Sequence, residues 1–106
     1  MIRVIPISGD RSIGFHAAGH SGSAPRGSDI ICAAVSALTQ TAYLALAHYG
    51  IRCRCNRHDE SGVFTVIADD CEKTRIILTN MYCGLIAIAD QHPQHLRVAP
   101  FQEVEA

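Results

Sequence analysis

Tryptophan is absent from this 106-residue chain, and aromatic side chains are scarce, with three tyrosines and three phenylalanines. Proteins that hold single-stranded nucleic acid stack its bases on aromatic rings, so this shortage argues against such a platform. Lysine occurs once, at Lys73, and the formal net charge is −1. No strong basic field therefore exists to attract phosphates, and we expect no direct nucleic-acid binding.

Charge of either sign is also limited, because charged residues make up 18% of the chain and hydrophobic residues make up 48%. Intrinsic disorder requires the opposite balance, with low hydrophobicity and a high net charge. A chain of this length is typical of one folded domain. We therefore expect residues 1–106 to form a single domain.

No secretory signal is recognisable, because residues 1–10 contain Arg3 and lack a sustained apolar run. The five cysteines are an odd number, which does not suit a disulfide framework. We therefore expect a cytoplasmic, reducing compartment with free thiols. Four of the cysteines lack the paired spacing of a zinc site, namely Cys53, Cys55, Cys71 and Cys83. Neither a metal nor a cofactor is predicted.

One segment is free of charged residues and long enough to cross a bilayer, from Ile30 to Ile51. It contains six alanines and several polar residues, so its hydrophobicity is weak. This composition favours a buried helix in a globular domain over a membrane span. We therefore expect no membrane association.

The pattern of apolar residues predicts four strands and a short fifth. Residues 2–7 are β-branched and apolar, and residues 13–18 alternate in the strand period after a turn, so the two form a hairpin. Pro6 suits an edge or a strand end. Residues 51–57 and 63–68 form a second hairpin, in which Ile51, Cys53 and Cys55 share the buried face. Leu96 to Phe101 adds a last short strand.

Two long helices are predicted between these strands. The first runs from Asp29 to Tyr49, with Ser28 as its N-cap and Gly50 as its end. The second starts at the capping pattern Asp69-Asp70-Cys71-Glu72, ends near Gln91 before Pro93, and carries an apolar stripe. The stripe consists of Ile77, Met81, Leu85 and Ile88. The order β-β-α-β-β-α(-β) predicts an α+β domain with a mostly antiparallel sheet of four to five strands.

The segment with the clearest chemical content is GHSGSAPRGSDIICAAVSAL, residues 19–38. It places His20 at the end of a strand and Cys32 in the first turn of a helix, with a glycine-rich loop between them. A helix N-terminus stabilises a thiolate, an imidazole can exchange protons with it, and free helix-start amides can donate to an oxyanion. A buried structural cysteine and a solvated histidine are the alternatives, and spacing alone does not settle whether His20 reaches Cys32.

This segment resembles the signature of the Prp family, the ribosomal-processing cysteine proteases of bacteria. The family pattern is a Gly-His pair, a short variable glycine-rich loop, and the block Asp-Ile-Val-Cys-Ala-Ala-Val-Ser. Gly19 and His20 match the pair, and residues 29–36 match the block except that Ile31 replaces valine. A second segment, residues 84–98 (GLIAIADQHPQHLRV), resembles the C-terminal helix, proline and final strand of the family.

The resemblance implies a cysteine endopeptidase that removes a short N-terminal extension from a large-subunit ribosomal protein. Cys32 corresponds to the nucleophile of the family and His20 to its general base. Gly19, Asp29 and Ser36 correspond to positions that shape the site or contact the substrate. The resemblance thus assigns a role to each of these five residues.

The same resemblance extends beyond the five site residues. Residues 21–28 correspond to a flexible segment over the active site, and the family is generally homodimeric. The alternative function is a non-catalytic, ribosome-associated binding module with the same fold and an unreactive Cys32. A thiol-redox or metal protein is disfavoured by the cysteine spacing.

Several of these residues keep a second interpretation. Asp29 could orient His20 in a triad, but we favour a structural role as a carboxylate at the helix N-terminus. Ser36 lies one turn beyond Cys32 and could form a hydrogen bond near the site or bond its own helix backbone. Three arginines are predicted to form a basic stripe on the face opposite Cys53 and Cys55. We favour a stripe that is simply exposed to solvent over one that docks a partner. The stripe consists of Arg52, Arg54 and Arg57.

Overall fold

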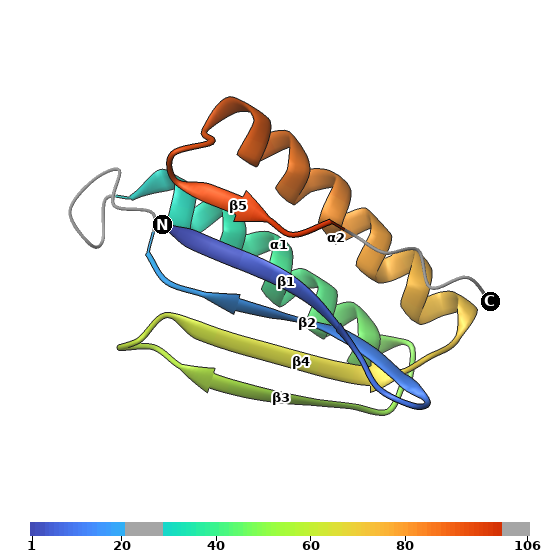
Figure 1. Ribbon diagram of the computed structural model, residues 1–106. Helices are drawn as coiled ribbons and strands as arrows, with labels where there is room; N and C mark the ends of the chain where they lie inside the picture. The colour runs from blue at the N-terminus through green and yellow to red at the C-terminus, as the bar shows by residue number, and fades with distance from the viewer. Residues whose placement is uncertain (21–28, 101–106) are drawn as a thin grey trace.

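The computed structural model describes residues 1–20 and 29–100, which form five strands and two helices (Figure 1). In chain order these are β1 (Ile2–Ser8), β2 (Ser12–Ala18), α1 (Ile30–His48), β3 (Cys53–His58), β4 (Val63–Asp69), α2 (Glu72–Gln91) and β5 (Leu96–Val98). The predicted α+β fold and element order are confirmed. The predicted loop 21–28 and Phe101 lie outside the described residues.

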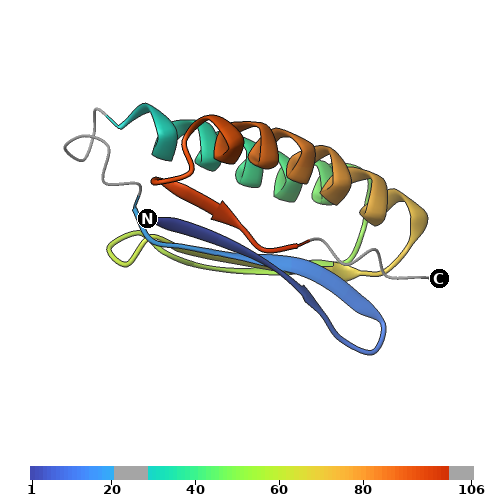
Figure 2. The ribbon, with the colours of Figure 1, turned by 45° about the horizontal axis from the view of Figure 1, so that its top comes forward.

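The five strands form one sheet in the order β3-β4-β2-β1-β5. All neighbours are antiparallel except β1 and β5, which are parallel because β5 returns to the sheet after α2. Both helices cover the same face of the sheet, so the fold has two layers (Figure 2). The predicted mostly antiparallel sheet is therefore correct, with its fifth strand present and short.

The position of Pro6 follows from the short length of β5. Strand β5 pairs only with Ile2, Arg3 and Val4, so the rest of β1 has no ladder partner from β5. Pro6 lies in this unpaired part of the β1 edge, and on its other edge it pairs with Phe15 of β2. A residue without a backbone N–H is tolerated at such an edge, as predicted.

The core lies between the sheet and the two helices. Phe15 of β2 contacts Phe64 of β4 edge-on, with ring centroids 5.9 Å apart, and Phe64 contacts Tyr43 of α1 at 6.1 Å. Helix α1 buries one face, consisting of Ile31, Val35, Thr39, Ala42 and Leu46. These positions repeat every three or four residues, as expected for an amphipathic helix that covers a sheet.

Helix α2 has the predicted length, but its buried face and its start differ from the prediction. Met81 and Leu85 of the predicted stripe are buried, whereas Ile77 and Ile88 are only partly buried. The face is rotated toward Thr74, Leu78 and Tyr82, which are all buried. The exact buried face of a helix depends on its neighbours, which periodicity does not specify.

The predicted capping pattern at the start of α2 is not formed. Cys71 occupies the N-cap position and makes no side-chain capping bond. The Thr74 hydroxyl instead donates to the backbone carbonyl of Asp69 at 2.7 Å. Asp70 accepts two hydrogen bonds from the Arg75 guanidinium, at 2.7 and 2.9 Å. The carboxylate therefore fixes the first turn through a charged pair.

Strand β3 is more exposed than predicted, because it is an edge strand that α1 and α2 hardly cover. Cys53 is half-buried and contacts the core, but Cys55 is exposed. Burial and the neighbouring Cys55 raise the pKa of the Cys53 thiol. The prediction that both thiols lie on a buried face is therefore wrong for Cys55.

Helix α1 is long and apolar enough to cross a membrane by length and composition, as the core helices of many globular proteins are. In this fold it packs against α2 and the sheet, and Leu46 at its C-terminal end is completely buried. Its boundaries agree with the prediction within a residue, because Gly50, with φ +70°, follows the C-terminal cap Tyr49.

Candidate active site

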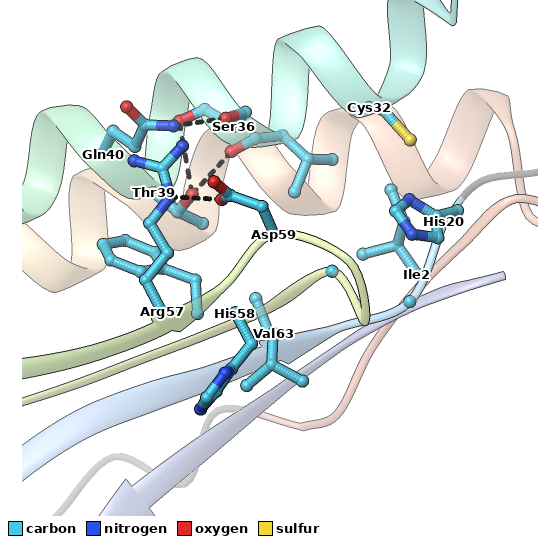
Figure 3. Close-up of a pocket in the computed structure, with 15 residues that line it drawn as sticks. Ile2, His20, Cys32, Ser36, Thr39, Gln40, Arg57, His58, Asp59 and Val63 are labelled. Atoms are coloured by element: carbon cyan, nitrogen blue, oxygen red, sulfur yellow. Dashed lines mark hydrogen bonds and ion pairs between the residues drawn. The ribbon is translucent and has the colours of Figure 1, made fainter. Parts of the chain in front are cut away.

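A cleft of about 170 Å³ lies where three elements meet: the end of β2, the first turns of α1 and the β3–β4 turn. Its lining includes four of the five site residues inferred from the sequence, namely Gly19, His20, Cys32 and Ser36. Figure 3 shows the cleft, with α1 on one side and the β3–β4 hairpin on the other. The structure therefore brings these four residues together around a single space.

Gly19 directs the chain from β2 toward the cleft. It has φ +100°, a conformation that residues with a Cβ rarely adopt, and a Cβ there would collide with the carbonyl oxygen of Met1. The next residue, His20, is exposed and presents its imidazole to the cleft. Gly19 is thus required for the path of the backbone that carries the imidazole.

Cys32 lies in the first turn of α1 and is half-buried. Its thiol lines the cleft, and in Figure 3 the sulfur points toward the His20 ring. The helix places Cys32 there because Ile31 and Val35, on adjoining positions, are anchored in the core. A thiol on the edge of a buried helical face is accessible and still held firmly.

Asp29 is the N-cap of α1, which corrects the prediction that Ser28 holds this position. Its carboxylate is 9% exposed and accepts hydrogen bonds from the backbone amides of Ile31 and Cys32, at 3.0 and 3.1 Å. The capping role favoured from the sequence agrees with this geometry. The hypothesis that helix-start amides donate to an oxyanion is wrong for Ile31 and Cys32, because Asp29 already occupies both.

The wall of the cleft continues along α1 for two more turns. The Ser36 hydroxyl accepts a hydrogen bond of 2.6 Å from the Gln40 side chain, and both residues line the cleft (Figure 3). The hydroxyl thus has a side-chain partner within the site. Gln40 was missed from the sequence, although its spacing of eight residues from Cys32 places it on the same helical face.

The opposite wall comes from the β3–β4 turn, which the sequence did not connect with the site. Arg57, His58, Asp59 and Gly62 all line the cleft. The Arg57 guanidinium pairs with Asp59 at 2.8 Å, and both side chains are more than half exposed. Such a pair adds little stability but sets the polarity of this end of the cleft.

The predicted basic stripe is wrong for Arg57. Successive side chains of a strand alternate between faces, so Arg57 shares the face of Cys53 and Cys55, whereas Arg54 points to the other side. Figure 3 shows Arg57 directed toward α1. Its side chain therefore belongs to the cleft, and the three arginines do not form one surface.

The other thiols lie away from the cleft lining. Cys71 is exposed at the start of α2, where the Thr74 hydroxyl lies 3.2 Å from its sulfur and lowers the pKa of the thiol. Cys83 is an exposed residue in the middle of the same helix. Within residues 1–20 and 29–100, no three His, Cys, Asp or Glu side chains are grouped as metal ligands would be.

The family comparison agrees with this geometry. The model of the family described as Cysteine protease Prp matches residues 1–97. The chain belongs to the Prp family of cysteine proteases. The resemblance carried by its two sequence motifs is therefore confirmed, and the protein is a cysteine protease. No match was found among curated proteins.

Solved structures extend the similarity to the whole fold. The ribosomal processing protease Prp from S. aureus, in complex with a covalently linked product peptide, shares 25% identity with a TM-score of 0.83. The alignment covers 92% of this chain and 97% of the S. aureus chain. The same protease with a substrate peptide shares 22% identity over 93% and 98% of the two chains, with a TM-score of 0.73. A protein from Streptococcus mutans shares 24% identity over 92% and 91%, with a TM-score of 0.66.

Proposed function

We propose that this Prp-family protein is an endopeptidase in which Cys32 is the nucleophile and His20 the general base. The observation that carries the proposal is the meeting of the two side chains in one cleft, although they come from different elements. A nucleophile and a base that share an open cleft are the minimum required for acyl transfer. Family membership supports the reaction type.

The reaction follows from the chemistry of the two groups. The His20 imidazole accepts the thiol proton, and the Cys32 sulfur attacks the scissile carbonyl carbon. The C–N bond then breaks, and the imidazolium transfers its proton to the leaving amine. Water attacks the thioester with His20 as the base, which releases the new carboxylate and restores the thiol. No metal or cofactor is required for these steps.

Three further residues support this pair. Gly19 permits the turn that carries His20, Asp29 holds the first turn of α1 and hence Cys32, and Ser36 lines the cleft one turn further along. We assign Gly19 and Asp29 to shaping the site and Ser36 to contact with the substrate. Polar groups along α1, including Gln40, are suited to hydrogen bonds with an extended peptide.

The proposed substrate is the N-terminal extension of a large-subunit ribosomal protein. The S. aureus relative is described as a ribosomal processing protease and has been captured with a substrate peptide and a product peptide. A cleft open to solvent suits a flexible N-terminal segment better than a folded region, because an extended chain can enter without unfolding a domain. We further propose that the protein is cytoplasmic, where ribosomal proteins are made, and that it forms a homodimer.

The test uses newly translated large-subunit ribosomal proteins of the bacterium that encodes this chain. We expect the purified protein to shorten one of them at its N-terminus, as measured by intact mass spectrometry. Cys32→Ala and His20→Ala should each reduce cleavage by at least a thousandfold and leave the circular dichroism spectrum unchanged. Full cleavage by Cys32→Ala would falsify the proposal.

Matched controls separate catalysis from general effects of substitution. Cys83→Ala and His92→Ala remove one exposed thiol and one exposed imidazole outside the cleft lining and should cleave normally. If wild-type protein binds the ribosomal proteins without shortening any of them, and Cys32→Ala binds equally well, the alternative of a non-catalytic binding module is supported instead. Alkylation with iodoacetamide must be mapped residue by residue, because the Thr74 hydroxyl also lowers the pKa of the Cys71 thiol.

A further inference from the structure

The β3–β4 turn contacts the imidazole of His20. The Nε2 atom of His20 lies 3.4 Å from the backbone carbonyl oxygen of Glu60, forty residues further along the chain. A carbonyl oxygen only accepts, so the ring nitrogen must donate. The contact is long for a hydrogen bond, and such contacts in catalytic sites commonly tighten when the substrate is bound.

The direction of this contact would set which ring nitrogen is the acceptor. A neutral imidazole carries one proton, and the hydrogen bond made by one nitrogen sets the state of the other. With its proton on Nε2, directed to Glu60, the ring has its lone pair on Nδ1. Nδ1 is then the atom that accepts a proton from a thiol.

Gly62 allows the turn to approach the imidazole this closely. It has φ +66°, and a Cβ at this position would lie 2.6 Å from the carbonyl oxygen of Gly19 and 3.1 Å from Cε1 of His20. The first distance is too short for any side chain, and its partner is backbone that cannot move aside. Any residue other than glycine would therefore push the turn away from the imidazole or displace the ring.

The position of the turn is set by the sheet. Strand β4 pairs with β2, and Phe64, just after the turn, lies opposite Ala17, three residues before His20. Within the turn, the Gly62 amide donates to the Asp59 carbonyl at 3.2 Å and the Arg57 guanidinium pairs with the Asp59 carboxylate. The Glu60 carbonyl is therefore held at the imidazole by main-chain pairing and local bonds.

We propose that the Glu60 carbonyl orients His20 and fixes its Nε2–H tautomer, and that Gly62 is a positioning residue for the general base. The inference rests on the proposed function, since it assigns a partner to the proposed base. The acceptor is a backbone atom, so a change of the Glu60 side chain leaves it in place. The glycine is the position at which the contact can be altered.

The kinetic test compares Gly62→Ala with Gly50→Ala. Gly50 has nearly the same backbone conformation, φ +70°, but nothing lies within 4 Å of a Cβ there. Both variants place an alanine at a similar positive φ, and only Gly62→Ala also meets the Gly19 backbone and the imidazole. With the peptide that spans the mapped cleavage site, we expect Gly62→Ala to lower kcat on the order of 10–100-fold with little change in KM. Gly50→Ala should retain the wild-type kcat.

A spectroscopic test does not depend on the stability of Gly62→Ala. Long-range ¹H–¹⁵N spectra of Cys32→Ala, well above the ordinary histidine pKa of about 6.5, report which nitrogen of His20 carries the proton. His20→Gln identifies the signal. We expect the Nε2–H tautomer.

The outcomes distinguish this inference from the proposed function. The Nδ1–H tautomer, or a kcat for Gly62→Ala within twofold of that for Gly50→Ala, overturns the positioning role while Cys32→Ala remains inactive. Cleavage by Cys32→Ala overturns the proposed function itself, whatever the tautomer. Loss of kcat in Gly62→Ala together with the Nε2–H tautomer supports both.

Discussion

At the scale of single residues, Asp29 both caps the N-terminus of α1 and contacts the proposed nucleophile, Cys32. Its carboxylate holds the amide of Cys32 itself, so the cap fixes the backbone of the proposed nucleophile. The sequence left two roles open for Asp29, namely capping α1 and orienting His20. A substitution that removes the charge but keeps a hydrogen-bond acceptor distinguishes these two roles.

Asp29→Asn keeps an N-cap acceptor, whereas Asp29→Ala removes it. If Asp29 acts as a cap, we expect Asp29→Asn to preserve the free energy of unfolding within a few tenths of a kcal/mol and to retain cleavage, and Asp29→Ala to lose about 1 kcal/mol. Urea denaturation and peptide cleavage measure the two quantities. A stable Asp29→Asn variant that no longer cleaves would show that the carboxylate acts on His20.

At the scale of elements, the first turn of α2 depends on a charged pair. The Arg75 guanidinium donates two hydrogen bonds to the Asp70 carboxylate, which lowers the pKa of Asp70. A carboxyl group whose pKa is lower in the folded chain stabilises the fold above its unfolded pKa of about 3.9. This contribution is lost as the pH falls through the folded pKa.

We therefore expect Asp70→Asn to lower the melting temperature at pH 7 by a few degrees at most, because both side chains are partly exposed to solvent and such pairs contribute little. The difference from wild type should shrink below about pH 4 and disappear once Asp70 is protonated in the wild type. Melting curves from pH 2 to pH 7 measure it. Asp90→Asn, an exposed carboxylate near the end of α2, is the control and should show no such convergence. A constant difference at every pH contradicts this assignment.

At the scale of the whole molecule, a small two-layer fold leaves many large apolar side chains outside its core. Seven large hydrophobic residues are exposed among those described, including Leu44 and Ile76 on the helices and Tyr49 just after α1. Exposed apolar surface favours association. The homodimer implied by the family resemblance is consistent with this surface, and the oligomeric state is directly measurable.

We expect a solution mass of about 23 kDa, twice the 11.5 kDa of one chain. Sedimentation equilibrium over a wide range of protein concentrations measures this mass and the dissociation constant. Because association follows mass action, the dimer should give way to the monomer only on dilution. A mass of 11.5 kDa at every concentration would exclude the homodimer.

Local sequence patterns determined much of this fold and part of the site. Alternation and helical periodicity predicted every element, and Gly50 and Pro93 marked the helix ends. Periodicity and helix-ending residues are properties of a few neighbouring positions, so they can be read from the sequence without knowing the tertiary structure. The Gly-His pair and the Cys32 block similarly identified the residues now proposed as the catalytic pair.

Tertiary structure alone decided what faces the proposed base. The sheet order β3-β4-β2 brings the turn at residues 59–62 to His20, although no local pattern links them. Tertiary packing also brought Arg57 to the cleft and left Cys55 exposed at an edge. Strand pairing and packing act between distant residues, and they therefore settled which side chains and carbonyls share the cleft.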